Sequence, residues 1–360
     1  MTRIVVSLVL ALWCRAGAAT PGPRWVRAFP DVPYAALVWY DPPDTYWVTT
    51  CVPVEGRALL RTEDGGASWE TVADGLRHGR TGCDASVRYG VVRSNPEVMY
   101  KDDEVFYRSE DGGEHWDRVE FPPVVGEAVT RRALAVGPRH ERRIAYRRSG
   151  RGGRLRVIDL DTDEIAGAED GTTWTHPESG EVYYQAGQPA HGISVGYVDF
   201  DRLAFVPFSS TSDHVGGFGF ASDDSRAFLS VELYVFDPEA PIEVWRAGDG
   251  ENPSFSFDSA PRHLGTPTAV AYHAETDMMV LAGKHLEHQR VIASGDGGAT
   301  WVEIGGRSGM LYFLTGHDAV YMQTSDGLYM LRLPMGTVAA TSPTAKLTTA
   351  WGALKRNAVQ

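Results

Sequence analysis

Arginine is concentrated in one segment of this acidic chain, between positions 131 and 156. Ten of the 26 residues there are arginine, whereas the whole chain has a formal net charge of −13. A guanidinium group binds carboxylate, sulfate or phosphate through paired hydrogen bonds. Arg142 with Arg143 and Arg147 with Arg148 are therefore weak candidates for binding an acidic ligand. The alternative is ordinary surface charge, because neighbours on a strand point to opposite faces and most charged side chains are simply solvated.

Carboxylates and histidines do not form a recognisable metal-binding pattern in the sequence. The acidic run from Asp159 to Glu164 has a calcium-loop spacing, but an EF-hand requires glycine at the sixth position, where Glu164 stands. His285 and His288 are three residues apart, so on a strand their rings would point to opposite faces. The sequence also lacks the lysine-bearing glycine loop that cradles a phosphate. We therefore expect no metal and no cofactor.

An eight-residue box with the pattern S/T-x-D-x-G-x-x-W occurs at residues 62–69, 109–116 and 294–301. Each box follows a short apolar run and precedes an alternating one, which predicts strand, turn and strand. The aspartate can accept backbone hydrogen bonds, the glycines permit a positive φ, and the hydroxyl and the tryptophan can fix the two ends of the turn. We assign these residues to stability: Thr62, Asp64, Gly66 and Trp69; Ser109, Asp111, Gly113 and Trp116; Ser294, Asp296, Gly298 and Trp301.

The box resembles the Asp box, or BNR repeat, of sialidase-like β-propellers. The resemblance implies a propeller whose boxes sit at outer hairpins, away from the catalytic face. It does not imply one activity, since such boxes occur in sialidases, xyloglucanases, sortilin-type receptors, photosystem assembly factors and exported proteins without known activity. Sialidases usually carry their first substrate-binding arginine in an Arg-Ile-Pro-like motif. The nearest stretch here, Arg27-Ala-Phe-Pro30, has an extra residue and no matching sequel, so no catalytic residue is assigned.

The spacing of the boxes predicts the size of the repeating unit. Asp64 and Asp111 are 47 residues apart, the length of one four-stranded blade. Degenerate copies of the box and of the turns that precede it occur in the remaining sequence. One of them, which we call the worn box, lies at residues 169–174. We expect an all-β fold, a single β-propeller of about seven four-stranded blades over residues 25–335. Closure of the ring would remove exposed sheet edges.

The two ends of the chain have a different character from the propeller. Residues 1–19 combine a short positive start, an apolar run from Ile4 to Trp13 and small residues, which is typical of a secretory signal peptide. The apolar run is too short to span a membrane. Residues 336–360 read as a linker and a short basic tail.

Two cysteines follow the predicted signal peptide. Cys51 and Cys83 form a disulfide in one interpretation and are two buried thiols in the other. We expect a secreted, periplasmic or cell-envelope protein with no membrane span. The acidic net charge argues against nucleic acid as a partner.

The sequence favours a non-enzymatic binding or scaffold module over an enzyme. The expected partner is a glycan or another envelope or extracellular protein, and we expect a monomer. The alternative is a glycoside hydrolase of sialidase-like type. A retaining glycosidase needs two carboxyl groups about 5 Å apart, and no spacing in this chain forces such a pair.

Overall fold

The computed structural model describes residues 24–332, except 53–55, 74–87, 104, 121–129, 150–153, 189–191, 212–214, 222–227, 233–241, 247–254, 258–263, 265, 286–287, 297, 299 and 308. The described residues form 27 β-strands and one 3-10 turn, η1 (Ala274–Thr276). No helix in this part of the chain is long and apolar enough to cross a membrane. The predicted signal peptide, the predicted linker and tail, and Cys83 lie outside the described residues.

The first three sheets each contain four antiparallel strands in sequence order. Their strands are β2 (Ala36–Asp41), β3 (Thr45–Val52), β4 (Gly56–Thr62) and β5 (Glu70–Ala73); β6 (Arg88–Val91), β7 (Met99–Asp103), β8 (Val105–Ser109) and β9 (Asp117–Arg118); and β10 (Thr130–Val136), β11 (Arg143–Ser149), β12 (Arg154–Asp159) and β13 (Ile165–Thr175).

The long strand β13 ends the third sheet and begins the fourth, because its first part pairs with β12 and its last part with β14. The fourth sheet continues with β14 (Val182–Gln188), β15 (Gly192–Asp199) and β16 (Ala204–Thr211). An eight-stranded sheet follows, made of β17 (Val215–Ala221), β18 (Phe228–Glu232), β19 (Ile242–Arg246), β20 (Phe255–Phe257), β21 (Thr266–His273), β22 (Met278–His285), β23 (His288–Ser294) and β24 (Val302–Gly305). The last sheet contains β25 (Met310–Phe313), β26 (Ala319–Thr324), β27 (Gly327–Arg332) and β1 (Val26–Arg27).

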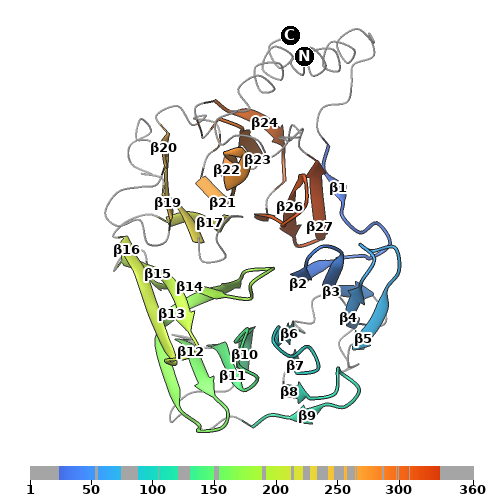
Figure 1. Cartoon of the computed structure of the whole chain (residues 1–360). Helices are drawn as coiled ribbons and strands as arrows, with labels where there is room; N and C mark the ends of the chain where they lie inside the picture. Colours follow the sequence, from blue (N-terminus) through green and yellow to red (C-terminus); the bar gives the residue numbers. More distant parts are fainter. Residues whose placement is uncertain are drawn as a thin grey trace.

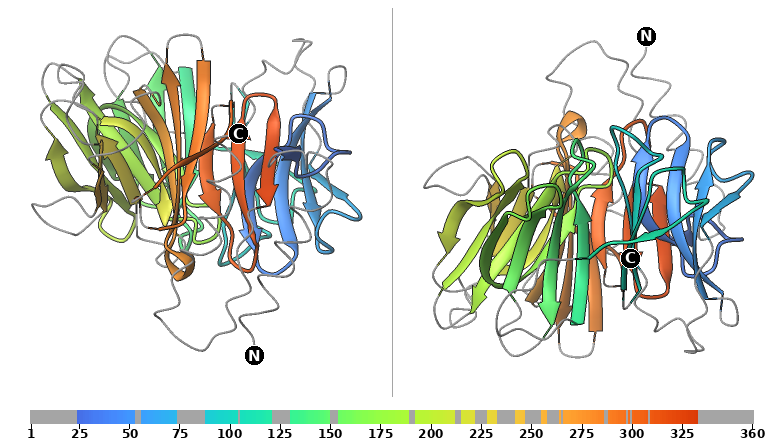
Figure 2. Two further views of the ribbon diagram at one scale, coloured as in Figure 1. Left: turned by 90° about the horizontal axis from the view of Figure 1, so that it is seen from above. Right: turned by 90° about the horizontal axis from the view of Figure 1, so that it is seen from below.

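The sheets stand around a ring, which Figure 1 shows along its axis and Figure 2 shows from the side. The hydrophobic clusters lie between neighbouring sheets: one joins Trp47 and Leu59 to Tyr89, and the next joins Tyr100 to Ile144. Because both faces of a sheet are covered, some strands are continuous apolar runs without polar alternation. In β22 the residues 278–283 are all buried.

The N-terminal strand closes the ring. β1 pairs antiparallel with β27, with Val26 opposite Met330 and Arg27 opposite Tyr329. The start of the described chain therefore completes the last sheet and covers an edge that would otherwise be free to pair with another molecule. The all-β propeller of four-stranded units that the sequence predicts is confirmed.

The number of blades is corrected: the propeller has six blades, not about seven. The described strands pair into sheets of four, four, seven, eight and four strands, and the seven-stranded sheet consists of two four-stranded units that share β13. The reason is a parallel pairing of β17 with β21, which places Phe218 opposite Ala269 and fuses two four-stranded units into one sheet. The worn box expected at residues 169–174 is also not a turn. It runs inside β13, where Gly171 pairs with Ala186.

Candidate functional site

A cavity of about 230 Å³ lies between the inner strands of the first four sheets. Residues of β2, β3, β4, β6, β10 and β13 line it, together with Arg93, and Figure 1 places β2, β6 and β10 toward the middle of the ring. Its wall combines aliphatic and polar side chains in equal number. The polar side chains on the wall are Arg57, Arg88, Arg93, Thr49, Tyr89 and Thr175. Among the described residues, the lining therefore has cationic and hydroxyl groups and no carboxylate.

The turn of the β13–β14 hairpin, residues 176–181, bonds to three other sheets beside this cavity. The Tyr40 N–H donates to the Pro177 carbonyl at 2.9 Å, which ties the turn to β2. The Glu178 carboxylate accepts from the hydroxyl of Thr315 at 2.8 Å, in the β25–β26 turn. Arg93, just after β6, donates to the carbonyls of the turn. In Figure 1 the tip of this hairpin reaches toward β2 in the middle of the ring, so it fixes the cavity wall at that point.

Arg93 is a partly buried cation whose hydrogen-bond partners are neutral. Its Nε donates to the Glu178 carbonyl at 3.1 Å, and its Nη2 donates to the carbonyls of His176 at 3.0 Å and Pro177 at 3.3 Å. Its guanidinium carbon lies 5.7 Å from the centroid of the Trp39 ring. Among the described residues no carboxylate pairs with it. Burial lowers the pKa of Arg93 to about 9.

His176, whose carbonyl accepts a hydrogen bond from Arg93, has a strongly lowered pKa. Burial, and then the positive charge of Arg93, lower the pKa of His176 to about 3. Its Nδ1 accepts from the N–H groups of Glu178 at 3.2 Å and Ser179 at 3.1 Å. His176 is therefore neutral at physiological pH and stabilises the turn as a hydrogen-bond acceptor.

A second polar cluster joins the first and last sheets. The His317 Nε2 lies 2.8 Å from the Tyr46 hydroxyl and 2.9 Å from that of Tyr40, and its Nδ1 lies 3.1 Å from that of Tyr321. Burial raises the pKa of all three tyrosines and lowers the pKa of His317. The cluster is thus neutral near pH 7, and its hydrogen bonds connect β2 and β3 with β26 where the ring closes.

The three boxes form the turns of the outer hairpins β4–β5, β8–β9 and β23–β24. In the third box the Ser294 hydroxyl donates to the Asp296 carboxylate at 2.8 Å and accepts from the Gly298 N–H at 2.7 Å. The same carboxylate accepts from the N–H of Thr300 at 2.8 Å and from its hydroxyl at 2.5 Å. The first and second boxes repeat this pattern around Asp64 and Asp111.

The glycine of the second box also allows close packing between sheets. Gly113 has a φ of 96°, and a Cβ there would lie 2.8 Å from the carbonyl oxygen of Val72 in β5. The preceding glycine, Gly112, donates its N–H to the Glu97 carbonyl at 2.9 Å, in the β6–β7 turn. Trp116 donates its indole N–H to the Gly113 carbonyl at 2.9 Å. The box thus connects the outer hairpin to its own sheet and to the sheet before it.

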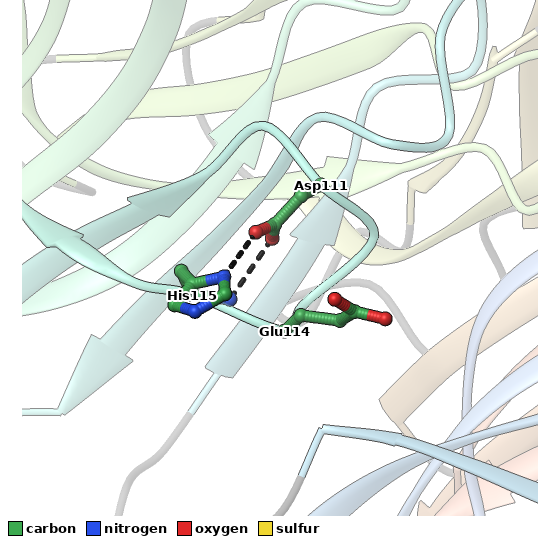
Figure 3. A group of neighbouring side chains, drawn as sticks. All are labelled: Asp111, Glu114 and His115. Atoms are coloured by element: carbon green, nitrogen blue, oxygen red, sulfur yellow. Dashed lines mark hydrogen bonds and ion pairs between the residues drawn. The ribbon is translucent and has the colours of Figure 1, made fainter.

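Three side chains of the second box also come close enough to suggest a metal site. The ligand atoms of Asp111, Glu114 and His115 lie within 4.8 Å of one another, and all three residues are exposed. Figure 3 shows Asp111 facing His115, whose N–H donates to one carboxylate oxygen at 2.9 Å and whose Nδ1 lies 2.6 Å from the other. These hydrogen bonds lower the pKa of Asp111 to about 2 and raise the pKa of His115. The turn geometry of the box accounts for the whole arrangement.

Of the arginines singled out from the sequence, Arg142 and Arg143 pair with different carboxylates and do not line the cavity. Arg142 pairs with Asp161 at 2.5 Å, and Arg143 pairs with Asp159 at 2.7 Å. Arg143 also donates to the Phe200 carbonyl at 2.7 Å, so it connects the third sheet to the fourth. Arg147 and Arg148 follow in β11, and the side chain of Arg148 is outside the described part. Arg142 and Arg143 are thus already neutralised by nearby carboxylates.

Cys51 is buried in β3, with 2% of its surface exposed, and takes part in a disulfide. Cys83 lies outside the described residues, so its pairing with Cys51 stays a prediction. Cys51 lies opposite Arg57 of β4, and Arg57 lines the cavity. Cys51 is therefore near the cavity wall.

The fold defines the class of protein as a β-propeller, and similar solved structures are of that class. No protein-family model matches the chain, and no curated protein matches it in sequence. YCF48 bound to a D1 peptide is 16% identical, with a TM-score of 0.53 over 88% of this chain and 96% of that one. YCF48 from Cyanidioschyzon merolae is also 16% identical, with a TM-score of 0.52 over 86% and 98%. An oligogalacturonate lyase from Vibrio parahaemolyticus is 10% identical, with a TM-score of 0.54 over 88% and 95%. Likeness at these identities shows the fold alone.

The cavity arginines were missed in the sequence because they are scattered along it. Arg57 and Arg88 are 31 residues apart and lie on different sheets. One signal was available: Arg93 interrupts the apolar run from Tyr89 to Val92 directly before a turn. A single cation at the end of a buried strand needs a partner, and that need could have drawn attention to it.

Proposed function

We propose that the chain is an exported, non-enzymatic binding module for an envelope or extracellular protein or a glycan, with a protein segment as the favoured ligand. The observation that carries the proposal is the central cavity, which combines aliphatic walls with arginine and hydroxyl groups. A cavity of about 230 Å³ is smaller than most sites for whole small molecules, which are about 300–1,000 Å³. It suits one protruding group of a larger partner.

The composition of the wall supports a protein segment over a glycan. A sugar ring carries several hydroxyl groups, and each of them needs a hydrogen-bond partner when it is buried. Leu37, Val91 and Val136 on the wall offer none. A peptide can bury an apolar side chain against such residues, and YCF48, which has the same fold, is known bound to a D1 peptide.

Export is part of the proposal and is supported by two features. The apolar N-terminal run resembles a signal peptide, and Cys51 is engaged in a disulfide, which persists mainly in oxidising compartments. The competing function, a glycoside hydrolase, is supported by the box resemblance. Propellers carry both roles, as the oligogalacturonate lyase illustrates, so the fold does not decide between them.

One experiment with two arms tests the proposal. The purified protein is applied to an array of peptides from envelope and secreted proteins. In parallel it is incubated with sialosides and with plant and bacterial polysaccharides, followed by chromatography of the products. We expect saturable capture of peptides and no release of sugar. Release of sugar in proportion to protein concentration would overturn the proposal that the protein is not an enzyme. Failure to capture any peptide on the array would overturn the proposal that its ligand is a protein segment.

A further inference from the structure

We propose that the central cavity binds a carboxylate of the partner protein, either an acidic side chain or a chain end, and that Arg93 is its partly buried counter-charge. The inference deepens the proposed function, because it names the group that the binding module recognises. It rests on three observations: an unneutralised cation, the convergence of further arginines, and the size and polarity of the cavity.

The first observation is the electrostatic state of Arg93. A buried charge is costly unless it is paired, and carbonyl dipoles compensate it only in part. Arg93 has three carbonyl acceptors and the Trp39 ring, but its Nη1 makes no hydrogen bond to a described residue. Arg93 is also one of the residues that line the cavity. An anion in the cavity would supply the missing negative charge without disturbing the carbonyl contacts.

The second observation is the position of the other cavity arginines. Arg57 comes from β4 and Arg88 from β6, so two separate sheets contribute an arginine to the lining of the cavity that also contains Arg93. Carboxylates are bound well by arginine, whose planar donor fork matches the two oxygens. Arg142 is not among the residues that line the cavity, so it serves as the matched control.

The third observation selects the source of the carboxylate. The volume of about 230 Å³ admits one side chain or one chain end. Leu37, Val38 and Val136 line the cavity next to the arginines, so its occupant has both an apolar and an anionic part. A hydrophobic C-terminal residue, or an acidic side chain with its methylene groups, has this combination. A uronic acid carries the same anion but surrounds it with hydroxyl groups.

The test uses small probes that differ in one group. N-acetyl-L-leucine is titrated against N-acetyl-L-leucinamide by calorimetry at constant ionic strength, with the melting temperature as a second readout. We expect the acid to bind and to raise the melting temperature, as a ligand of the folded state must, and the neutral amide to do neither. Equal behaviour of acid and amide would overturn the proposal. Tighter binding of galacturonate or sulfate than of the peptide acid would overturn the assignment to a protein carboxylate.

Variants locate the binding. Arg88→Gln removes a cavity cation from an exposed position and should weaken binding of the acid at least tenfold. Arg142→Gln, a matched change outside the cavity, should leave the affinity within twofold. If the Arg93→Gln variant folds, it should not bind the acid. If it does not fold, the Arg88→Gln variant still tests the site. Equal weakening by Arg88→Gln and Arg142→Gln would show general screening and overturn the site.

The outcome separates this inference from the proposed function. If peptides are captured on the array but acid and amide behave alike, the carboxylate site is wrong and the binding module stands. If the acid binds through Arg88 but the array is silent, the site stands and the protein ligand is wrong.

Discussion

Removal of one box carboxylate should destabilise the protein by an amount that follows from its contacts. In the third box Asp296 accepts hydrogen bonds from the hydroxyl of Ser294 and from the N–H and hydroxyl of Thr300. A hydrogen bond to a charged group contributes about 1.5–3 kcal/mol, and water can replace part of this where the group is half-buried. Asp296→Ala should therefore lower the free energy of unfolding by about 2–4 kcal/mol.

The assay is urea unfolding followed by tryptophan fluorescence, with Glu303→Ala as the control on the same hairpin. Glu303 pairs with Arg290 at 3.4 Å at the surface, and such a pair contributes about 0–1 kcal/mol. Ser294→Ala should also destabilise, by about 1–3 kcal/mol, because it leaves the buried Gly298 N–H without its acceptor. The double variant should cost less than the sum, since both changes break the Ser294–Asp296 bond. An Asp296→Ala variant as stable as Glu303→Ala would refute the stabilising role of the box.

Four further outcomes are expected. The free energy of unfolding should fall as the pH drops from about 6.5 toward about 3, because His176 binds a proton in the unfolded chain but stays neutral when it is buried in the folded protein. Urea titrations at several pH values should show this slope, and His176→Asn should flatten it. Gly113→Ala should lower the melting temperature more than Gly112→Ala, because only the former meets backbone, and equal losses would contradict this packing. Digestion without reductant should yield a Cys51–Cys83 peptide by mass spectrometry; alkylation of both thiols in the folded protein would refute the pairing. Deletion of the chain through β1 should expose β27, lower the melting temperature and promote association in light scattering, and an unchanged monomer would contradict closure by β1.

The part of this structure that the sequence reveals is the part made by local contacts. In a box, Asp296 accepts hydrogen bonds from Ser294 and Thr300, which lie in the same eight-residue segment. The residue types that a box needs therefore occur close together in the sequence and can be recognised there. The propeller follows from repetition of such units. The prediction of a turn fails at residues 169–174. This segment has a similar sequence pattern, but it lies inside β13 because pairing with β14 determines its conformation.

The number of sheets and the cavity depend on contacts between distant segments. The parallel pairing of β17 with β21 has no local signature, so the fusion of two units could not be seen. Arg57, Arg88 and Arg93 line one cavity only because the ring brings β4 and β6 together there. Conversely, Arg142 and Arg143 attracted notice because they are adjacent in sequence, but each faces its own aspartate.

The central cavity can be tested as the binding site by locating the backbone amides that a bound peptide protects. Hydrogen exchange would be measured with and without the tightest peptide from the array. If the peptide binds in the cavity, exchange should slow in residues 88–93 and in the hairpin turn 176–181 and should not change in the three boxes. Protection confined to the box hairpins, with unchanged exchange around the cavity, would show that the peptide binds elsewhere.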